Sequence, residues 1–285
     1  MKKVGYFFFC FLPIIASVGL QFVAAFPIMG FRLLHIFFSC IFSGRKIPYT
    51  DLIWQFSNEL NDSSVFTAIS VLYAALGIFV FGFWYLKQFS GNLRFPLKKF
   101  ANPFLVLGII FMVPALQMAS AFLTSISAAF FPKWMDFYEN MMESAGFSQE
   151  PSLLLVLYAV LLGPIAEELI FRGVTLSSAR KALPLWAANL FQAFLFGVFH
   201  MNVIQGIYAF FIGLFLGYIC GRGGSVWLSI FLHILFNFWG TFAFEALYSI
   251  PLLIVFLLLG ILGIILFHKN TSSSGVKHLA NFSDI

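Results

Sequence analysis

The sequence predicts an all-α, polytopic transmembrane bundle of about eight spanning helices. Of its 285 residues, 61% are hydrophobic and only 9% are charged, whereas an average soluble domain carries about 25% charged residues. Apolar runs of about 18–25 residues recur along the chain, which is the length that crosses a hydrocarbon core as a helix. We expect one membrane-embedded domain, residues 1–269, followed by a polar, disordered tail, residues 270–285.

The first apolar run, 4–28, follows Lys2 and Lys3. It is too long for the apolar core of a signal peptide, so we interpret it as an uncleaved first span. The next segment, 29–43, is apolar but short, and either lies at the interface or lengthens the first span. The remaining spans are expected at 65–86, 103–131, 152–176, 183–201, 203–220, 225–245 and 249–267.

Loop charges predict how the chain is oriented. The net charge of +5 sets orientation in a chain this apolar, so we do not interpret it as nucleic-acid binding. The loop 87–102 holds four basic residues and no acid, whereas the loop 132–151 holds four acids against Lys133. With eight spans the basic loops and both termini share one side, which the positive-inside rule makes cytoplasmic. This orientation conflicts with three basic residues, which it would place on the non-cytoplasmic side: Arg32, Arg45 and Lys46. The composition favours a bacterial plasma membrane.

Ionisable side chains stand out within the spans of residues 152–245. Such groups cost several kcal/mol at membrane depth by most scales, so they usually face the protein interior and have a function. At about 1.5 Å per residue, Glu167, His200 and Asn237 lie roughly 20–24 Å from the cytoplasmic boundary, and His233 roughly 14 Å. Three helices therefore bring polar groups to similar depth, which indicates one intramembrane site.

Helical spacing adds detail to this site. Glu168 and Arg172 are four residues apart and can pair on one helix face. Glu167 points about 100° away from Glu168 and is free to face a different neighbour. His233 and Asn237 share a face, and Phe196 lies one turn before His200. Taken singly, the Glu168–Arg172 pair could simply stabilise the packing of helices, Asn237 could form an interhelical hydrogen bond, and Phe196 could belong to the core packing.

The residue types fit hydrolysis. A carboxylate in an apolar pocket can act as general base or acid, and a histidine beside it can share the proton or hold a metal. A second histidine with an asparagine can donate hydrogen bonds to an oxyanion. This set suits attack of water on a peptide carbonyl. One glutamate with two histidines could equally bind a single zinc ion, and the residues leave both readings open.

Three motifs resemble those of the CPBP family of intramembrane proteases, also called the CAAX protease and bacteriocin-processing, or Abi, family. They are "EELIFR" at 167–172, "FGVFH" at 196–200 and "HILFN" at 233–237. The family pattern is EExxxR, FxxxH and HxxxN, each on its own helix. The resemblance covers roughly residues 150–245, and the eight-span count agrees with the family fold.

The resemblance implies a role for each matched residue. Glu167 and His200 would activate water, and His233 with Asn237 would stabilise the oxyanion. Three further residues would support them: Glu168, Arg172 and Phe196. The family is described both as glutamic and as metal-dependent, so if a divalent metal such as zinc is bound, its ligands would be Glu167, His200 and His233. The expected partner is a peptide or membrane-protein substrate within lipid.

Competing functions remain open at this point. A proton-coupled transporter would also place Glu and His in the membrane, although it would spread polar groups along a whole pathway. A non-enzymatic bacteriocin-immunity or membrane scaffold protein would not need the carboxylate. Other intramembrane protease types fit poorly, because the sequence has no HExxH, no Asp within a span and no GxSG serine in a span. Cys10, Cys40 and Cys220 form no CxxC, so neither a disulfide framework nor a cysteine zinc site is indicated.

Overall fold

The computed structural model describes residues 3–42, 48–88, 95–147, 150–243, 247 and 249–271. Nearly all of these residues are helical and none is in a strand, which confirms the predicted fold class. Within the described residues, six helices are long and apolar enough to cross a membrane, and two shorter apolar helices bring the number to the eight expected. The tail after residue 271 and Glu245, at the end of a predicted span, lie outside the described residues.

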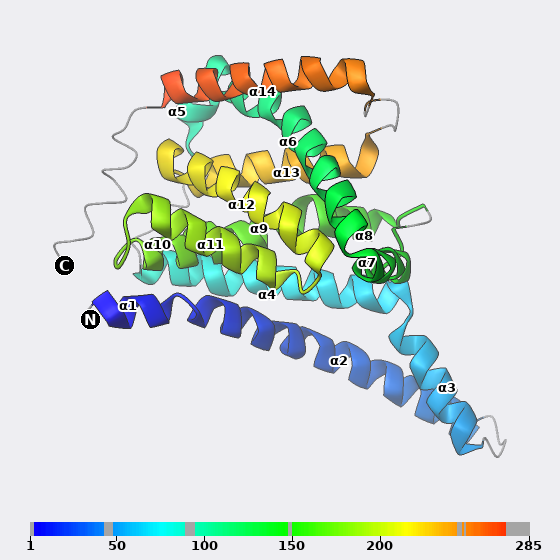
Figure 1. Ribbon diagram of the computed structural model, residues 1–285. Coiled ribbons are helices and arrows are strands. Elements are labelled where there is room, and N and C mark those ends of the chain that lie inside the picture. The colour runs from blue at the N-terminus through cyan, green and yellow to red at the C-terminus, as the bar shows by residue number, and fades with distance from the viewer. Residues whose placement is uncertain are drawn as a thin grey trace.

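The first span is longer than expected. After the short helix α1 (Lys3–Phe9), α2 runs from Leu12 to Phe42, so the segment 29–43 lengthens the first span. Its 31 residues rise about 46 Å, which exceeds a hydrocarbon core of about 30 Å. The end of α2 and the amphipathic helix α3 (Tyr49–Leu60) extend beyond the bundle (Figure 1). A second amphipathic helix, α7 (Pro132–Ser144), also occupies a predicted loop. With 12 and 13 residues, α3 and α7 are too short to cross a hydrocarbon core.

Three long helices frame the bundle: α4 (Ser63–Gln88), α6 (Pro103–Phe130) and α14 (Ile250–Asn270). The short helix α5 (Leu97–Phe100) leads into α6. Glycines bring α6 and α14 together, since a Cβ added at Gly263 would lie 2.6 Å from the carbonyl oxygen of Gly108. Small residues allow such close backbone approach in membranes. The amide of Asn102 also donates to Asn270 Oδ1 at 3.1 Å. The end of α14 and α1 lie on the same side of the bundle (Figure 1).

The hairpin of α11 (Leu185–Phe199) and α12 (Val203–Gly223) is equally tight. A Cβ at Gly197 would lie 2.6 Å from the carbonyl oxygen of Gly206. The turn between the two helices needs a left-handed residue, Met201, at φ 53°, and the side chain of Asn202 caps α12 by accepting from Gln205 N at 3.0 Å. This turn fixes His200 at the end of α11.

We expect Gly197→Ala to lower both stability and any activity that depends on His200. The added methyl meets backbone that cannot move aside, and overpacking of this kind costs about 1–3 kcal/mol. Thermal unfolding in detergent measures the loss. Gly30→Ala is the matched control, because nothing lies within 4 Å of a Cβ there. Equal unfolding temperatures for the two variants would contradict the close contact.

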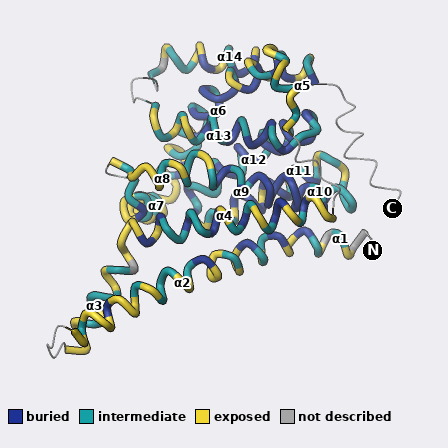
Figure 2. Tube along the Cα trace, turned by 180° about the vertical axis from the view of Figure 1, so that it is seen from behind, coloured by how far each residue is buried: buried dark blue, intermediate teal, exposed yellow. Residues whose placement is uncertain are grey.

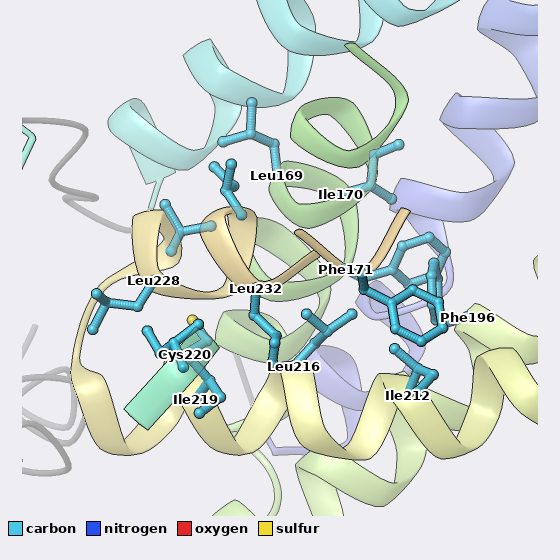
Figure 3. Close-up of a cluster of buried hydrophobic side chains, with 14 of the residues drawn as sticks. Leu169, Ile170, Phe171, Phe196, Ile212, Leu216, Ile219, Cys220, Leu228 and Leu232 are labelled. Atoms are coloured by element: carbon cyan, nitrogen blue, oxygen red, sulfur yellow. The ribbon is translucent and has the colours of Figure 1, made fainter. Parts of the chain in front are cut away.

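Buried residues concentrate in the centre of the bundle, around α9 to α12 (Figure 2). The main core cluster joins buried residues from seven helical elements, between Phe81 and Phe267. Figure 3 shows Phe171 beside Phe196, and Leu216 beside Leu232. This apolar cluster contains Phe196 and immediate sequence neighbours of Glu168, His233 and Asn237, so it holds together the helices that carry them.

Candidate active site

The fourth span, residues 153–179, is not a uniform α-helix. It consists of α8 (Leu153–Leu157), η1 (Tyr158–Leu162), α9 (Gly163–Glu168), η2 (Leu169–Thr175) and α10 (Leu176–Ala179), where η1 and η2 are π-helical turns. Single π turns inside α-helices occur frequently at functional sites. Here they bracket the two glutamates, a feature for which the sequence analysis had no expectation.

Pro164 leaves one carbonyl in η1 without a helical donor. The N–H of Gly163 reaches back five residues to the carbonyl of Tyr158. In the same register the carbonyl of Ala159 would receive the N–H of residue 164, which proline lacks. Asn237, on α13 (Val226–Phe242), supplies the donor instead, with Nδ2 2.8 Å from Ala159 O. Asn237 is thus tied to the helix that carries the glutamates, with one amide hydrogen left over.

Glu168 and Arg172 form the predicted ion pair, with Nη1 2.8 Å from Oε1 and both side chains fully buried. Arg172 also donates from Nη2 to the carbonyl of Gly213 at 3.2 Å, and its guanidinium lies 4.5 Å from the centre of the Phe196 ring. The same Gly213 carbonyl accepts from Gln192 Nε2 at 2.9 Å. Sequence reasoning missed Gln192, although a fully buried amide within an apolar span was the signal that could have found it.

His233 bridges the two glutamates. Its Nδ1 lies 2.9 Å from Glu168 Oε1, and its Nε2 lies 3.7 Å from Glu167 Oε2. The two carboxylates, expected to be free to face different neighbours, therefore meet one ring through its two nitrogens. A carboxylate accepts, so Nδ1 carries a proton and donates it. The side chain of Glu168 is fully buried, whereas that of Glu167 is 19% exposed, which makes Glu167 the carboxylate that a substrate can reach.

His200 lies at the end of α11, with its Nδ1 2.8 Å from the carbonyl oxygen of Phe196. Because that oxygen can only accept, Nδ1 is the protonated nitrogen, and in the neutral ring Nε2 keeps its lone pair. His200 is within electrostatic range of Glu167 and His233. The Phe196 ring packs edge-on against both imidazoles, with centroids 4.8 Å from His200 and 6.0 Å from His233, so Phe196 spaces the two histidines.

The described side chains, as they stand, form no three-residue metal site. Within the described ranges, no three His, Cys, Asp or Glu side chains come close enough together to hold an ion. The three side chains considered as zinc ligands, Glu167, His200 and His233, are each part of the site but do not converge as a ligand set. The chemistry below is therefore derived from the side chains alone.

Residues 149–239 match a family model described as "Type II CAAX prenyl endopeptidase Rce1-like". All three sequence motifs fall inside this segment. A similar protein is the "Putative membrane peptidase YdiL" of Bacillus subtilis (strain 168), at 25% identity over 84 residues, which is 30% of this chain and 34% of that protein. The match thus spans about a third of the relative's length. No solved structure matches. These similarities confirm the resemblance to the CPBP family and, with the apolar helices, an integral membrane protein.

Proposed function

We propose that this chain, whose motif-bearing segment is of the Rce1-like CAAX endopeptidase type, hydrolyses peptide bonds within the membrane with Glu167 as the general base. The observation that carries the proposal is the placement of one accessible carboxylate beside an imidazole that is anchored, through its other nitrogen, on a buried ion pair. An acid–base site needs a group that can take up and return a proton, together with neighbours that fix its geometry.

Charge balance assigns the protons. The charges of Glu168 and Arg172 cancel each other, so the remaining carboxylate, Glu167, can be balanced only by a proton shared with His233. If His233 Nε2 carried no proton, its lone pair would face the negative oxygen of an ionised Glu167, and the two would repel each other. The arrangement therefore favours either an imidazolium His233 beside ionised Glu167, or a neutral ring beside a protonated carboxyl. Both forms hold one proton between the two groups.

Water activation follows from this state. With Glu167 ionised, its free oxygen takes a proton from a water molecule that also donates to the Nε2 lone pair of His200. The water oxygen attacks the scissile carbonyl carbon and forms the new C–O bond. The proton held by Glu167 then passes to the leaving nitrogen as the C–N bond breaks, which gives a carboxylic acid and an amine. General acid–base catalysis of this kind contributes about 10²–10⁴-fold in rate.

The oxyanion would receive its hydrogen bonds from His233 and Asn237. His233 offers Nε2–H when both of its nitrogens carry protons, and the hydrogen bond from its Nδ1 to the buried carboxylate of Glu168, at 2.9 Å, fixes the direction of the ring. Asn237 offers the amide hydrogen that Ala159 does not use. Donors that are fixed before the charge develops are worth about 2.7–4 kcal/mol each in comparable sites.

The test compares peptide termini in membranes of cells that carry the wild-type chain or Glu167→Gln, with a chelator added in a parallel arm. We expect a set of new termini that appears with the wild type and with the chelator, and is missing with the variant. The same termini in both strains would refute the assignment of Glu167 as the general base. Loss of the termini on chelation alone would refute the metal-free route.

We expect Asn237→Leu to damage both folding and catalysis, and Pro164→Ala to repair only the first. Asn237→Leu leaves the Ala159 carbonyl unpaired, which costs about 1–3 kcal/mol. Pro164→Ala supplies an N–H in the register where the carbonyl needs one. Unfolding temperature and cleavage rate are measured on both single variants and on the double variant. If the double variant regains activity along with stability, Asn237 has no role in catalysis.

A further inference from the structure

Three basic side chains lie where spans begin or end. Arg180 directly follows the last residue of the fourth span, and Arg222 lies in the last turn of α12. Lys99 lies on α5, which leads into α6. Figure 1 shows α5 and α10 on the same side of the bundle as the end of α14. The three cations therefore occupy one end of the bundle, away from the candidate active site.

Contacts bring these cations together around the last turn of α12. The ammonium group of Lys99 donates a hydrogen bond to the carbonyl oxygen of Gly223, the residue after Arg222. Lys99 and Arg180 are both within electrostatic range of the sulfur of Cys220, which belongs to the same turn. Charges of like sign repel each other. Their convergence is therefore unfavourable unless an anion lies among them.

No carboxylate among the described residues supplies that anion. The described acids lie on or beside α3, on α7, at Glu150, and in the candidate active site. In that site the charge of Glu168 is already matched by Arg172. The three cations at the end of α12 consequently have no acidic side chain to balance them within the described part of the chain.

Two of the three side chains also hold buried donors that are unpaired. Nε and Nη1 of Arg180 and Nε of Arg222 are shielded from solvent and have no hydrogen-bond partner. Burial lowers the pKa of Arg180 and that of Lys99, because a cation withdrawn from water loses hydration. Unpaired buried donors are rare in native proteins, and an ion is one of the partners that explain them. These donors therefore indicate a ligand.

Arg222 and Lys99 have a structural role as well. Arg222 donates from Nη2 to the carbonyl oxygens of His268 and Thr271, at 3.0 and 3.3 Å, and Lys99 donates to the end of α12. Basic side chains stabilise the carboxyl ends of helices in this way. Helix capping does not account for Nε and Nη1 of Arg180, so the case for a ligand depends most on this residue.

We propose that Lys99, Arg180 and Arg222 form a binding site for a phosphate group at this end of the bundle. Guanidinium N–H groups and an ammonium ion are the donors that proteins use to bind phosphate oxygens. Because the site lies where spans end, it is within reach of the headgroup phosphate of an anionic lipid as well as of free phosphate in water. The proposal does not depend on the proposed peptidase function.

Thermal unfolding tests the site on the full-length chain, purified in a maltoside detergent and a phosphate-free buffer. Inorganic phosphate, phosphatidylglycerol and diacylglycerol are added in separate arms. We expect phosphatidylglycerol to raise the unfolding temperature above its value with diacylglycerol, because a ligand of the folded state stabilises that state. A rise with inorganic phosphate as well makes the phosphate group sufficient, whereas a rise with the anionic lipid alone identifies a headgroup site.

Two variants separate a specific site from general surface charge. Arg180→Met keeps the unbranched stem and removes the unpaired donors, and Lys87→Met is the matched control, because it removes an exposed charge from the last turn of α4. We expect Arg180→Met to weaken the binding of phosphatidylglycerol about tenfold or more, and Lys87→Met to leave it unchanged. Without ligand, Arg180→Met should unfold at no lower temperature than the wild type, since the lost donors had no partner.

Three results would overturn the proposal. Equal loss of binding in Arg180→Met and Lys87→Met would reduce the attraction to general surface charge. A lower unfolding temperature of Arg180→Met without ligand would show that the guanidinium has a structural partner. Wild-type protein that gains no more from phosphatidylglycerol or inorganic phosphate than from diacylglycerol would show that no phosphate group is bound.

Discussion

Replacing Glu167 by Gln should abolish nearly all peptide cleavage while the protein still inserts and folds. The amide keeps the shape of the side chain but cannot take a proton from water, so the expected loss is about 10²–10⁴-fold in rate. Little stability should be lost, because the side chain is partly exposed and its distance to His233 Nε2 is 3.7 Å. Single-turnover cleavage of a peptide identified from membranes, together with the unfolding temperature, measures both effects.

Glu143→Gln is the matched control, since it removes an exposed carboxylate from α7 and should leave the rate unchanged. Residues that act as one unit are strongly non-additive. The double variant Glu167→Gln/His200→Ala should therefore be little slower than Glu167→Gln alone. A Glu167→Gln enzyme that retains wild-type turnover would refute Glu167 as the general base.

The charged residues of the site could be found from the sequence because the rest of the chain is so apolar. Charged groups are rare in spans, and each was therefore visible. The Glu168–Arg172 pair followed from helical spacing alone, and the structure confirms it at 2.8 Å. The eight apolar helices were equally legible, because span length is set by the bilayer rather than by packing.

What the sequence could not supply depends on departures from regular helix and on contacts between helices. Spacing rules assume 3.6 residues per turn, and the π turns around Gly163 and Leu169 break that assumption. Both glutamates lie in the α-helical turn between them, and although their directions differ by about 100°, the two nitrogens of one ring, His233, face both. The partner of Asn237 is a backbone carbonyl freed by Pro164, and no pattern of side chains encodes such a contact. Helix α2 also continues past residue 28, and its end lies beyond the bundle (Figure 1).

Arg172→Leu should be the most destabilising single substitution in the site. It leaves the fully buried Glu168 carboxylate without its cation, and removing one partner of a buried pair typically costs about 3–5 kcal/mol. The Gly213 carbonyl also loses one of its two donors. Unfolding in detergent, followed by temperature or denaturant, measures the loss. Arg32→Leu is the matched control, because its pair with Glu59 is about 30% exposed and such pairs contribute about 0–1 kcal/mol.

The double variant Glu168→Gln/Arg172→Leu separates folding from chemistry. Without either charge there is no unpaired ion to bury, so much of the stability lost in Arg172→Leu should return. Activity should not return, because a neutral amide accepts a weaker hydrogen bond from His233 Nδ1 than a carboxylate does, and the ring that faces Glu167 and the developing oxyanion is then held less firmly. If stability and cleavage rate both recover fully, the Glu168–Arg172 pair serves only the packing of the helices. Recovery of stability with a rate that remains low would identify the buried pair as the anchor that fixes the position of His233.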